Sequence, residues 1–172
     1  MLIPRLLTAV LSVCLVSCGY RVAGHADLIP QKIQTIAIPT WANLTNRYTL
    51  TEKLPSAVSR EFISRTRYRI VTNPEEADAI LTGAVVNYLS FPSVSDPQTN
   101  RASAVQISVY LQVKLTERQT GKVLFTRPSM EFRQRYEIAI DQSRYFEESD
   151  FALDRLSRDV ARTLVSSILE AF

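Results

Sequence analysis

A run of strictly alternating side chains at residues 105–116 constrains the fold of this chain more than any other feature. The apolar positions are Val105, Ile107, Val109, Leu111, Val113 and Leu115, and the polar ones are Gln106, Ser108, Tyr110, Gln112, Lys114 and Thr116. Successive side chains of a β-strand point to opposite faces, so the pattern predicts a long strand with one core face and one wet face. A turn at residues 117–122 then predicts a hairpin that returns through residues 123–138, where Pro128 indicates a bulge or a sheet edge.

Two segments predict helices that cover this sheet. Apolar residues recur at helical spacing in the first segment, with Thr49 or Thr51 as N-cap: Leu50, Leu54, Ala57, Val58, Phe62 and Ile63. Pro55 lacks an amide proton, so this helix either starts near Thr51 or kinks. The terminal helix has one apolar stripe supported by three neighbours: Leu153, Leu156, Val160, Leu164 and Ile168, with Ala161, Val165 and Leu169. On its other face, Asp154 with Arg158 and Arg155 with Asp159 predict i,i+4 charge pairs in solvent.

The remaining strands are shorter. Residues 33–38 are rich in β-branched side chains and stop at Pro39, and residues 68–71 predict a second short strand. Residues 72–78 predict a turn with one helical turn, and residues 79–89 a buried strand in which Gly83 indicates a close approach by another group. Residues 90–101 have the composition of an exposed loop. The order predicts an α+β two-layer sandwich, a mostly antiparallel sheet of four to five strands with two helices on one face.

The N-terminus has the pattern of a bacterial lipoprotein signal. Arg5 precedes a short apolar run that ends in Leu15-Val16-Ser17-Cys18-Gly19. The run at residues 6–16 is much shorter than the roughly 20 residues of a membrane-spanning helix. We therefore expect residues 1–17 to be cleaved, Cys18 to carry a lipid anchor with several acyl chains, and residues 18–31 to tether a single domain at residues 32–172. The alternative is an ordinary secretory signal with a chance cysteine.

This assignment determines the compartment and the cysteine chemistry. Cys14 leaves with the signal and the sulfur of Cys18 is consumed by lipid, so no disulfide or thiol catalysis is expected. Gly19 stands where an Asp would mark inner-membrane retention in enterobacteria. The expected location is therefore the periplasmic face of the outer membrane, by lipid anchor.

Charge is distributed unevenly along a chain whose formal net charge is only +3. Residues 101–144 hold eight basic residues, Arg101, Lys114, Arg118, Lys122, Arg127, Arg133, Arg135 and Arg144, against four acidic ones. Residues 145–172 hold three arginines against six acidic residues. The asymmetry predicts a basic side and an acidic side of the molecule.

The sequence offers little material for catalysis. His25, the only histidine, falls in the tether, so neither a catalytic triad nor a metal-ligand cluster is expected in the domain. The acidic groups Glu75-Glu76-Ala77-Asp78 and Glu147-Glu148 are better explained as helix-start and surface charge. We expect no enzyme activity and no cofactor. Without a glycine-rich phosphate loop or a strong basic excess, nucleic-acid binding is not expected either.

Several segments together resemble the LptE family of lipopolysaccharide-assembly lipoproteins. They are Cys18-Gly19-Tyr20-Arg21-Val22, Ile36-Ala37-Ile38-Pro39 with Asn43 and Thr45, residues 65–71, Glu76-Ala77-Asp78-Ala79-Ile80-Leu81-Thr82-Gly83, and Phe132-Arg133-Gln134-Arg135-Tyr136-Glu137. Pro55 departs from the family, whose members usually have an uninterrupted helix there.

The resemblance implies a plug and assembly partner inside the outer-membrane β-barrel LptD, with direct contact to lipopolysaccharide. A wet sheet face suits a water-lined lumen, and the basic segment suits lipid phosphates. The candidate lipopolysaccharide-binding residues are Arg101, Lys122, Arg127, Arg133 and Arg135. The alternative is a lipoprotein that docks or activates a periplasmic cell-wall enzyme through an exposed strand edge. A lipoprotein hydrolase is a third, weaker hypothesis.

Overall fold

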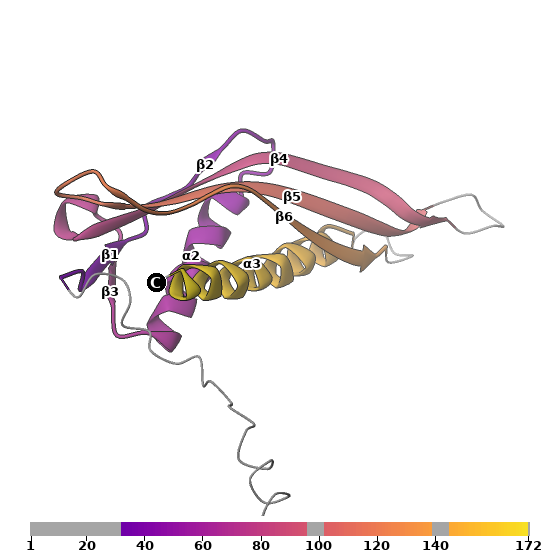
Figure 1. The fold of residues 1–172 in the computed structure, drawn as a ribbon. Helices are drawn as coiled ribbons and strands as arrows, with labels where there is room; N and C mark the ends of the chain where they lie inside the picture. The colour runs from indigo at the N-terminus through magenta and orange to yellow at the C-terminus, as the bar shows by residue number, and fades with distance from the viewer. Residues whose placement is uncertain (1–31, 96–101, 139–144, 172) are drawn as a thin grey trace, which may run out of the picture.

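Six strands form one sheet in the computed structural model, which describes residues 32–95, 102–138 and 145–171. The strand order is β3 (Arg69–Val71), β1 (Thr35–Ala37), β4 (Ala79–Ser95), β5 (Ala102–Glu117) and β6 (Val123–Glu137), and β2 (Ala42–Asn43) pairs with β4 beside β1. The predicted signal, the tether with Cys18, and Arg101 lie outside the described residues. Figure 1 shows β4, β5 and β6 as long, twisted ribbons that extend well past the short strands.

The sheet is mixed, and it has more parallel pairing than the sequence predicted. The long pairs β4 with β5 and β5 with β6 are antiparallel. The short pairs β1 with β3, β1 with β4 and β2 with β4 are parallel. Parallel neighbours need a crossover connection, and helix α2 (Leu50–Arg65) lies between β1 and β3 in the chain. The α+β prediction is thus confirmed, with a mixed six-stranded sheet.

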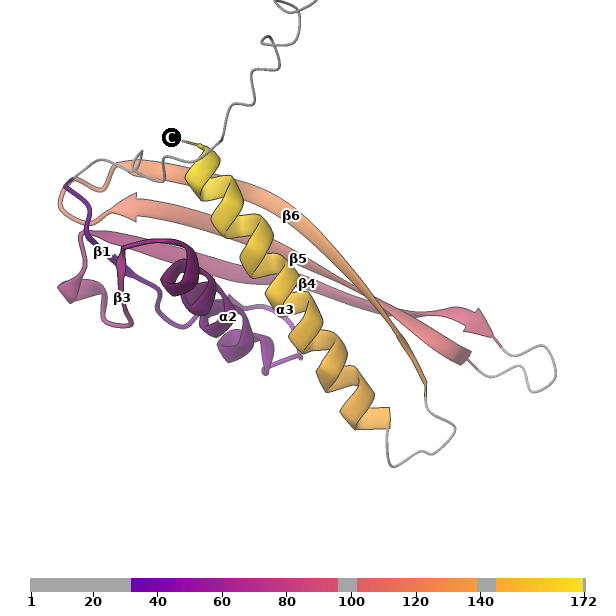
Figure 2. The same cartoon turned by 90° about the horizontal axis from the view of Figure 1, so that it is seen from below.

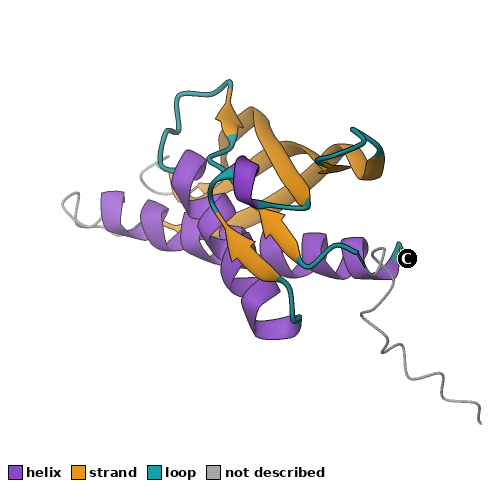
Figure 3. Ribbon diagram, turned by 90° about the vertical axis from the view of Figure 1, so that its left-hand side faces the viewer, coloured by secondary structure: helices purple, strands orange, loops and turns teal. Residues whose placement is uncertain are grey.

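Both helices lie on the same side of the sheet, which we call its inner face (Figures 1 and 3). The long helix α3 (Tyr145–Glu170) runs obliquely beneath β5 and β6 and packs against α2 (Figure 2). The predicted apolar stripe of α3 is buried from Leu153 to Ile168. Neither helix is apolar over a length that would cross a bilayer, among the residues described.

The alternation that opened the sequence analysis is confirmed on β5. All six apolar side chains from Val105 to Leu115 are buried, while Gln112 and Lys114 are exposed on the opposite, outer face. Ser108 is the exception, because it points outward and is nevertheless buried. Its cross-strand neighbours on the outer face are Leu89 and Arg133, two longer side chains that flank it on both sides.

The close approach predicted at Gly83 is made by Trp41. A Cβ atom at Gly83 would lie 2.3 Å from Trp41 Cδ2 and 2.5 Å from Cε2, so no other residue fits without displacing the indole. Trp41 precedes β2, which pairs with β4 next to Gly83, and its ring is 2% exposed. Because Gly83 has no side chain, the ring of Trp41, the largest core residue, can lie flat on β4.

The expected loop at residues 90–101 is partly wrong. β4 continues to Ser95 and pairs with β5 as far as Ala102, with register shifts around Pro92 and Val94. Pro92 and several serines gave this segment the composition of a loop. Pairing with β5 holds it as a strand, since a long partner strand supplies hydrogen bonds that composition does not report. Residues 96–101 lie outside the described part of the chain.

Both prolines that the sequence singled out occupy special positions. Pro128 falls at a register shift between the Leu111–Met130 and Val113–Arg127 pairs, on the edge strand β6, so bulge and edge are both confirmed. Helix α2 begins at Leu50, close to the expected start, with Thr49 at the N-cap but without a side-chain capping bond. Pro55 lies just beyond the first turn, with its ring buried.

Candidate functional site

The candidate site lies on the outer face of the sheet, where β4, β5 and β6 run beyond the short strands. Residues paired directly across strands share a face. Arg133 lies opposite Ser108 and Arg135 opposite Gln106, so both arginines point outward from β6. They are the two predicted lipopolysaccharide-binding residues that the structure brings together.

The other candidates are elsewhere. Arg127 pairs with the core residue Val113 and stacks on Phe125, with its guanidinium carbon 5.0 Å from the ring centroid, so it lies at the inner edge of β6. Lys122 is in the β5–β6 turn, at the opposite end of the hairpin. Arg101 is outside the described residues. The four candidates that the structure describes therefore do not form one patch. Lys122 lies at the other end of the hairpin, and the register shift at Pro128 puts Arg127 on the opposite face of β6 from Arg133 and Arg135.

A hydrogen-bonded network organises the centre of the outer face. Arg133 Nε and Nη2 donate to the two carboxylate oxygens of Glu131 at 2.7 and 3.0 Å. Tyr110 Oη donates to Glu131 Oε1 at 2.9 Å. The hydrogen bonds from Arg133 and then from Tyr110 hold the pKa of Glu131 below its ordinary value of 4.5, because both stabilise the charged carboxylate. The bond to Glu131 conversely raises the pKa of the Tyr110 hydroxyl.

Arg135 lies outside this network, with Glu137 two positions further along the same face of β6. Glu131 neutralises Arg133 and raises its pKa further, which keeps the guanidinium ionised. No ion-pair partner for Arg135 occurs among residues 32–95, 102–138 and 145–171. The outer face can thus present to a ligand two neighbouring arginines: Arg133, which Glu131 holds in place and neutralises, and Arg135, which has no ion pair within these described ranges.

Exposed apolar side chains border the same face on β4. Leu89 pairs with Ser108 and Phe91 with Gln106, which places both on the outer face, and they are 42% and 43% exposed. From β4 to β6 the face therefore changes from apolar to basic over two strand spacings, about 10 Å. We call Leu89, Phe91, Ser108, Tyr110, Glu131, Arg133 and Arg135 the outer-face patch.

The apolar half of this patch was missed in the sequence because Phe91 was assigned to the loop at residues 90–101 and Leu89 to a buried strand at residues 79–89. A signal was available: Leu89 and Phe91 continue the alternation with Ser90 between them. Period two at this point favours a continuing strand over a loop. Pro92 and the serines around it masked that signal.

Two of the resemblance segments make hydrogen bonds that hold the fold together. Asn43 Oδ1 accepts hydrogen bonds from the amide and hydroxyl of Thr45, and its Nδ2 donates to the carbonyl of Arg47 and to Thr51 Oγ1. These bonds build the connection from β2 to α2. Such side-chain bonds to nearby backbone replace the ladder bonds that a loop lacks.

The acidic run 75–78 likewise serves the fold. Asp78 Oδ2 accepts the amides of Gln34 and Thr35, both at 2.9 Å, and so holds the start of β1. Glu75 and Glu76 belong to the short 3-10 helix η2 (Pro74–Glu76), which Asn73 caps by accepting the amide of Glu75. This agrees with their assignment as helix-start and surface charge. Glu147 and Glu148 belong to α3, but their side chains are outside the described set.

Glu117 is a further carboxylate that the sequence did not single out. It is 6% exposed at the end of β5, where Lys32 Nζ lies 2.5 Å from Oε1 and Thr120 donates to Oε2. These bonds, that of Lys32 first, lower the pKa of the carboxylate. The pair attaches the start of the domain to the β5–β6 turn. In the described part of the chain, no three metal-ligating side chains come together.

Comparison with protein families gives one match. The model of the family described as "LptE: Lipopolysaccharide-assembly" matches residues 33–168, which is most of the chain. The match includes all of the described sheet and nearly all of both helices. No curated protein matches the chain in sequence.

Solved structures of low sequence identity share the fold. Rare lipoprotein B from Shewanella oneidensis is 10% identical, with a TM-score of 0.55 over 79% of this chain and 94% of that one. A hypothetical protein from Chlamydia trachomatis is 12% identical, with a TM-score of 0.55 over 80% and 96%. Uncharacterized lipoprotein B from Nitrosomonas europaea is 10% identical, with a TM-score of 0.53 over 77% and 79%. At these identities the likeness concerns the fold alone.

Proposed function

This chain belongs to the LptE family of lipopolysaccharide assembly, and we propose that it is a lipid-anchored plug and assembly partner of the β-barrel LptD. In this proposal Cys18 carries the anchor, residues 18–31 form the tether, and the domain lies at the periplasmic face of the outer membrane. The observation that carries it is the family match over residues 33–168. The family resemblance supports the LptD partnership.

Direct contact with lipopolysaccharide is the second part of the proposal, and the outer-face patch is its site. Lipopolysaccharide is an amphiphile with acyl chains and phosphate groups. The patch presents exposed Leu89 and Phe91 on β4 and the arginines Arg133 and Arg135 on β6. Guanidinium groups bind phosphate oxygens by charge-assisted hydrogen bonds. Apolar side chains favour contact with acyl chains, because that contact removes apolar surface from water. The order of these side chains across the sheet supports an amphiphilic ligand.

Affinity purification from the cells in which the protein occurs naturally tests the assembly role. We expect the affinity-tagged full chain to copurify a large outer-membrane β-barrel in stoichiometric amount after gentle detergent extraction. Capture of a soluble cell-wall enzyme without a barrel would reject the proposal in favour of the docking alternative.

Mass spectrometry of the N-terminus tests the anchor. We expect an acylated Cys18 as the first residue of the mature chain, and an unprocessed precursor for Cys18→Ala. Cys14→Ala is the matched control, because that cysteine leaves with the signal and its loss should change nothing. An unmodified Cys18 in the wild-type protein would contradict the anchor.

A further inference from the structure

A groove between the two helices carries charges that neither the fold nor the outer-face patch uses. It has a volume of about 380 Å³ and continues along the helices into a second hollow of about 240 Å³. Arg60 of α2 and Arg158 of α3 line both parts, and Arg162 lines the second. Both helices lie on the inner face of the sheet (Figure 3). The groove that they line is therefore on the opposite side of the sheet from the outer-face patch.

Two of the acidic residues that line the groove form ion pairs with residues other than its three arginines. Lys53 Nζ lies 2.6 Å from Asp154 Oδ1 across the two helices, and Arg65 pairs with Glu61 at 3.4 Å. The predicted pairing of Asp154 with Arg158 along α3 is therefore wrong. A lysine from the facing helix reaches that carboxylate instead, which sequence spacing within α3 does not reveal.

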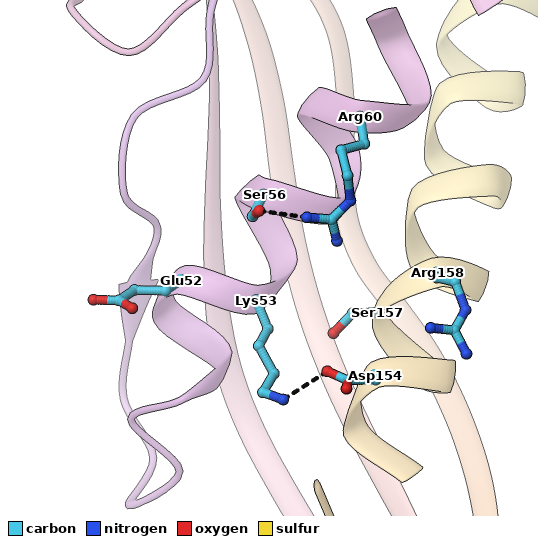
Figure 4. A pocket seen from close by; sticks show the side chains of 7 residues that line it. All are labelled: Glu52, Lys53, Ser56, Arg60, Asp154, Ser157 and Arg158. Carbon is cyan, nitrogen blue, oxygen red and sulfur yellow. Dashed lines mark hydrogen bonds and ion pairs between the residues drawn. The ribbon is translucent and has the colours of Figure 1, made fainter. Parts of the chain in front are cut away.

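Three arginines remain without a carboxylate. Arg60 Nη1 donates to Ser56 Oγ at 2.8 Å, and Figure 4 shows it extending from α2 over the groove. Arg158 and Arg162 have no ion pair within the described ranges. Among the residues that line the groove, Glu52 is the one acidic side chain left to oppose them. The groove thus has a local excess of positive charge, although residues 145–172, which form one of its sides, are acidic overall.

Ser157 adds an unpaired polar atom at the floor of the groove. Its side chain is only 3% exposed, and its Oγ has no hydrogen-bond partner in the described part of the protein. In Figure 4 the hydroxyl points into the space between the helices, beside Asp154. A buried hydroxyl without a partner destabilises the folded protein, and an acceptor supplied by a ligand would remove that cost.

We propose that this groove binds a phosphate group, either as the free ion or as a monoester. Arg60 and Arg158 donate to its oxygens from the two helices, Ser157 Oγ donates from below, and Arg162 adds positive charge along α3. The planar fork of donors on a guanidinium matches the spacing of phosphate oxygens, and several donors from different directions suit a tetrahedral anion better than a planar carboxylate. The groove opens to solvent, so it admits either free phosphate or the phosphate of a lipid head group.

Nuclear magnetic resonance titration of the purified full-length chain in detergent tests the proposal. Inorganic phosphate should shift the backbone amides of α2 and α3 that border the groove, and sodium acetate at equal ionic strength should not. Arg60→Gln with Arg158→Gln should weaken phosphate binding about tenfold. The matched control, Arg67→Gln with Arg155→Gln, removes two exposed arginines outside the groove and should bind as the wild type does.

Ser157→Ala separates a ligand-binding role from a merely structural one. Removal of an unpaired buried hydroxyl should raise the unfolding temperature, whereas removal of a donor to the ligand should weaken phosphate binding a few-fold. A variant that binds phosphate as tightly as the wild type, whatever its unfolding temperature, would overturn the assignment of Ser157 and with it the proposal.

Glycerol phosphate identifies the source of the ligand. If it shifts the same amides as inorganic phosphate, the site accepts the ester of a head group; if only inorganic phosphate does so, the site takes the free ion. Either result supports the proposal. Three results would overturn it: no shift with either probe, equal shifts with acetate, or tighter binding of a glutamate-rich peptide. Since the test does not involve the outer-face patch, its outcome is independent of the proposed contact with lipopolysaccharide.

Discussion

The two faces of β5 differ in what they contribute to the protein, although their residues alternate along the same strand. On the inner face, Val109 and Leu111 are fully buried under the helices. On the outer face, Tyr110 joins a hydrogen-bonded network with Glu131 and Arg133 that remains open to water. One position along the chain thus separates side chains that stabilise the fold from side chains available to a ligand.

The energies of the two faces explain the division. Burial of a Val or Leu side chain contributes about 1.5–3 kcal/mol to folding. The exposed pair of Arg133 with Glu131 adds little to stability, because water screens the charges and holding both side chains costs entropy. The inner face should therefore tolerate few changes, and the outer face should tolerate many while changing what the protein binds.

The largest expected effect follows from a charge placed on the inner face. Val109→Asp puts an unpaired carboxylate at a position with no exposure, which should cost about 4 kcal/mol or more and unfold most of the protein. Gln112→Asp, on the outer face of the same strand, should change the unfolding temperature little. Thermal unfolding by circular dichroism measures both, and equal losses for the two variants would refute the difference between the faces.

A smaller loss is expected at the contact of Gly83 with Trp41, also on the inner face. In Gly83→Ala the new Cβ would lie 2.3 Å from the indole, so the ring must move and the free energy of unfolding should fall by about 3 kcal/mol. Gly121→Ala is the control: its φ of 70° strains an alanine, but nothing lies within 4 Å, so about 1 kcal/mol is expected. Urea unfolding measures both, and a greater loss at Gly121 would contradict the assigned contact.

On the outer face the expected change concerns binding and not stability. Arg133→Glu with Arg135→Glu reverses two charges at the outer-face patch and should weaken binding of purified lipopolysaccharide about tenfold or more, with little effect on the unfolding temperature. Arg67→Glu with Arg155→Glu reverses two exposed arginines elsewhere and avoids the groove between the helices. Equal loss in both pairs, or in neither, would show that the patch is only a solvated sheet face.

The smallest effect is a pH dependence within the network. Because the pKa of Glu131 is lowered in the folded protein, its contribution to stability is present above 4.5 and is lost as the pH falls through the folded value. The pKa of Tyr110 is raised, so its contribution is present below 10.0 and is lost at higher pH. In Glu131→Gln the contribution of Glu131 should vanish and that of Tyr110 should decrease, because the pKa of Tyr110 should return toward 10.0.

Denaturant midpoints of the wild type and Glu131→Gln, compared between about pH 3 and pH 7, measure the acid side of this dependence. Ultraviolet titration of the Tyr110 hydroxyl, identified with Tyr110→Phe, measures the alkaline side. Identical pH profiles for the wild type and Glu131→Gln would show that the network does not persist in solution.

Much of the fold could be predicted because it depends on local periodicity. The buried stripe of α3, the buried positions of β5, and the bulge at Pro128 agree with the sequence analysis. The sequence did not indicate which candidate basic residues lie together: Arg133 and Arg135 share the outer face, whereas Arg127 and Lys122 lie away from them. A count of charges along the chain does not include the bulge, and the bulge changes which way a side chain points.

The sequence by itself determined which side chains of β5 and α3 are buried, since backbone geometry repeats every two residues in a strand and every 3.6 in a helix. Only the tertiary structure decided the parallel pairing of β1, the contact of Trp41 with Gly83, and the meeting of Lys53 with Asp154. Each of these depends on which distant segments are brought together when the core is buried. That choice depends on the free energy of the whole packed chain, which no local period encodes.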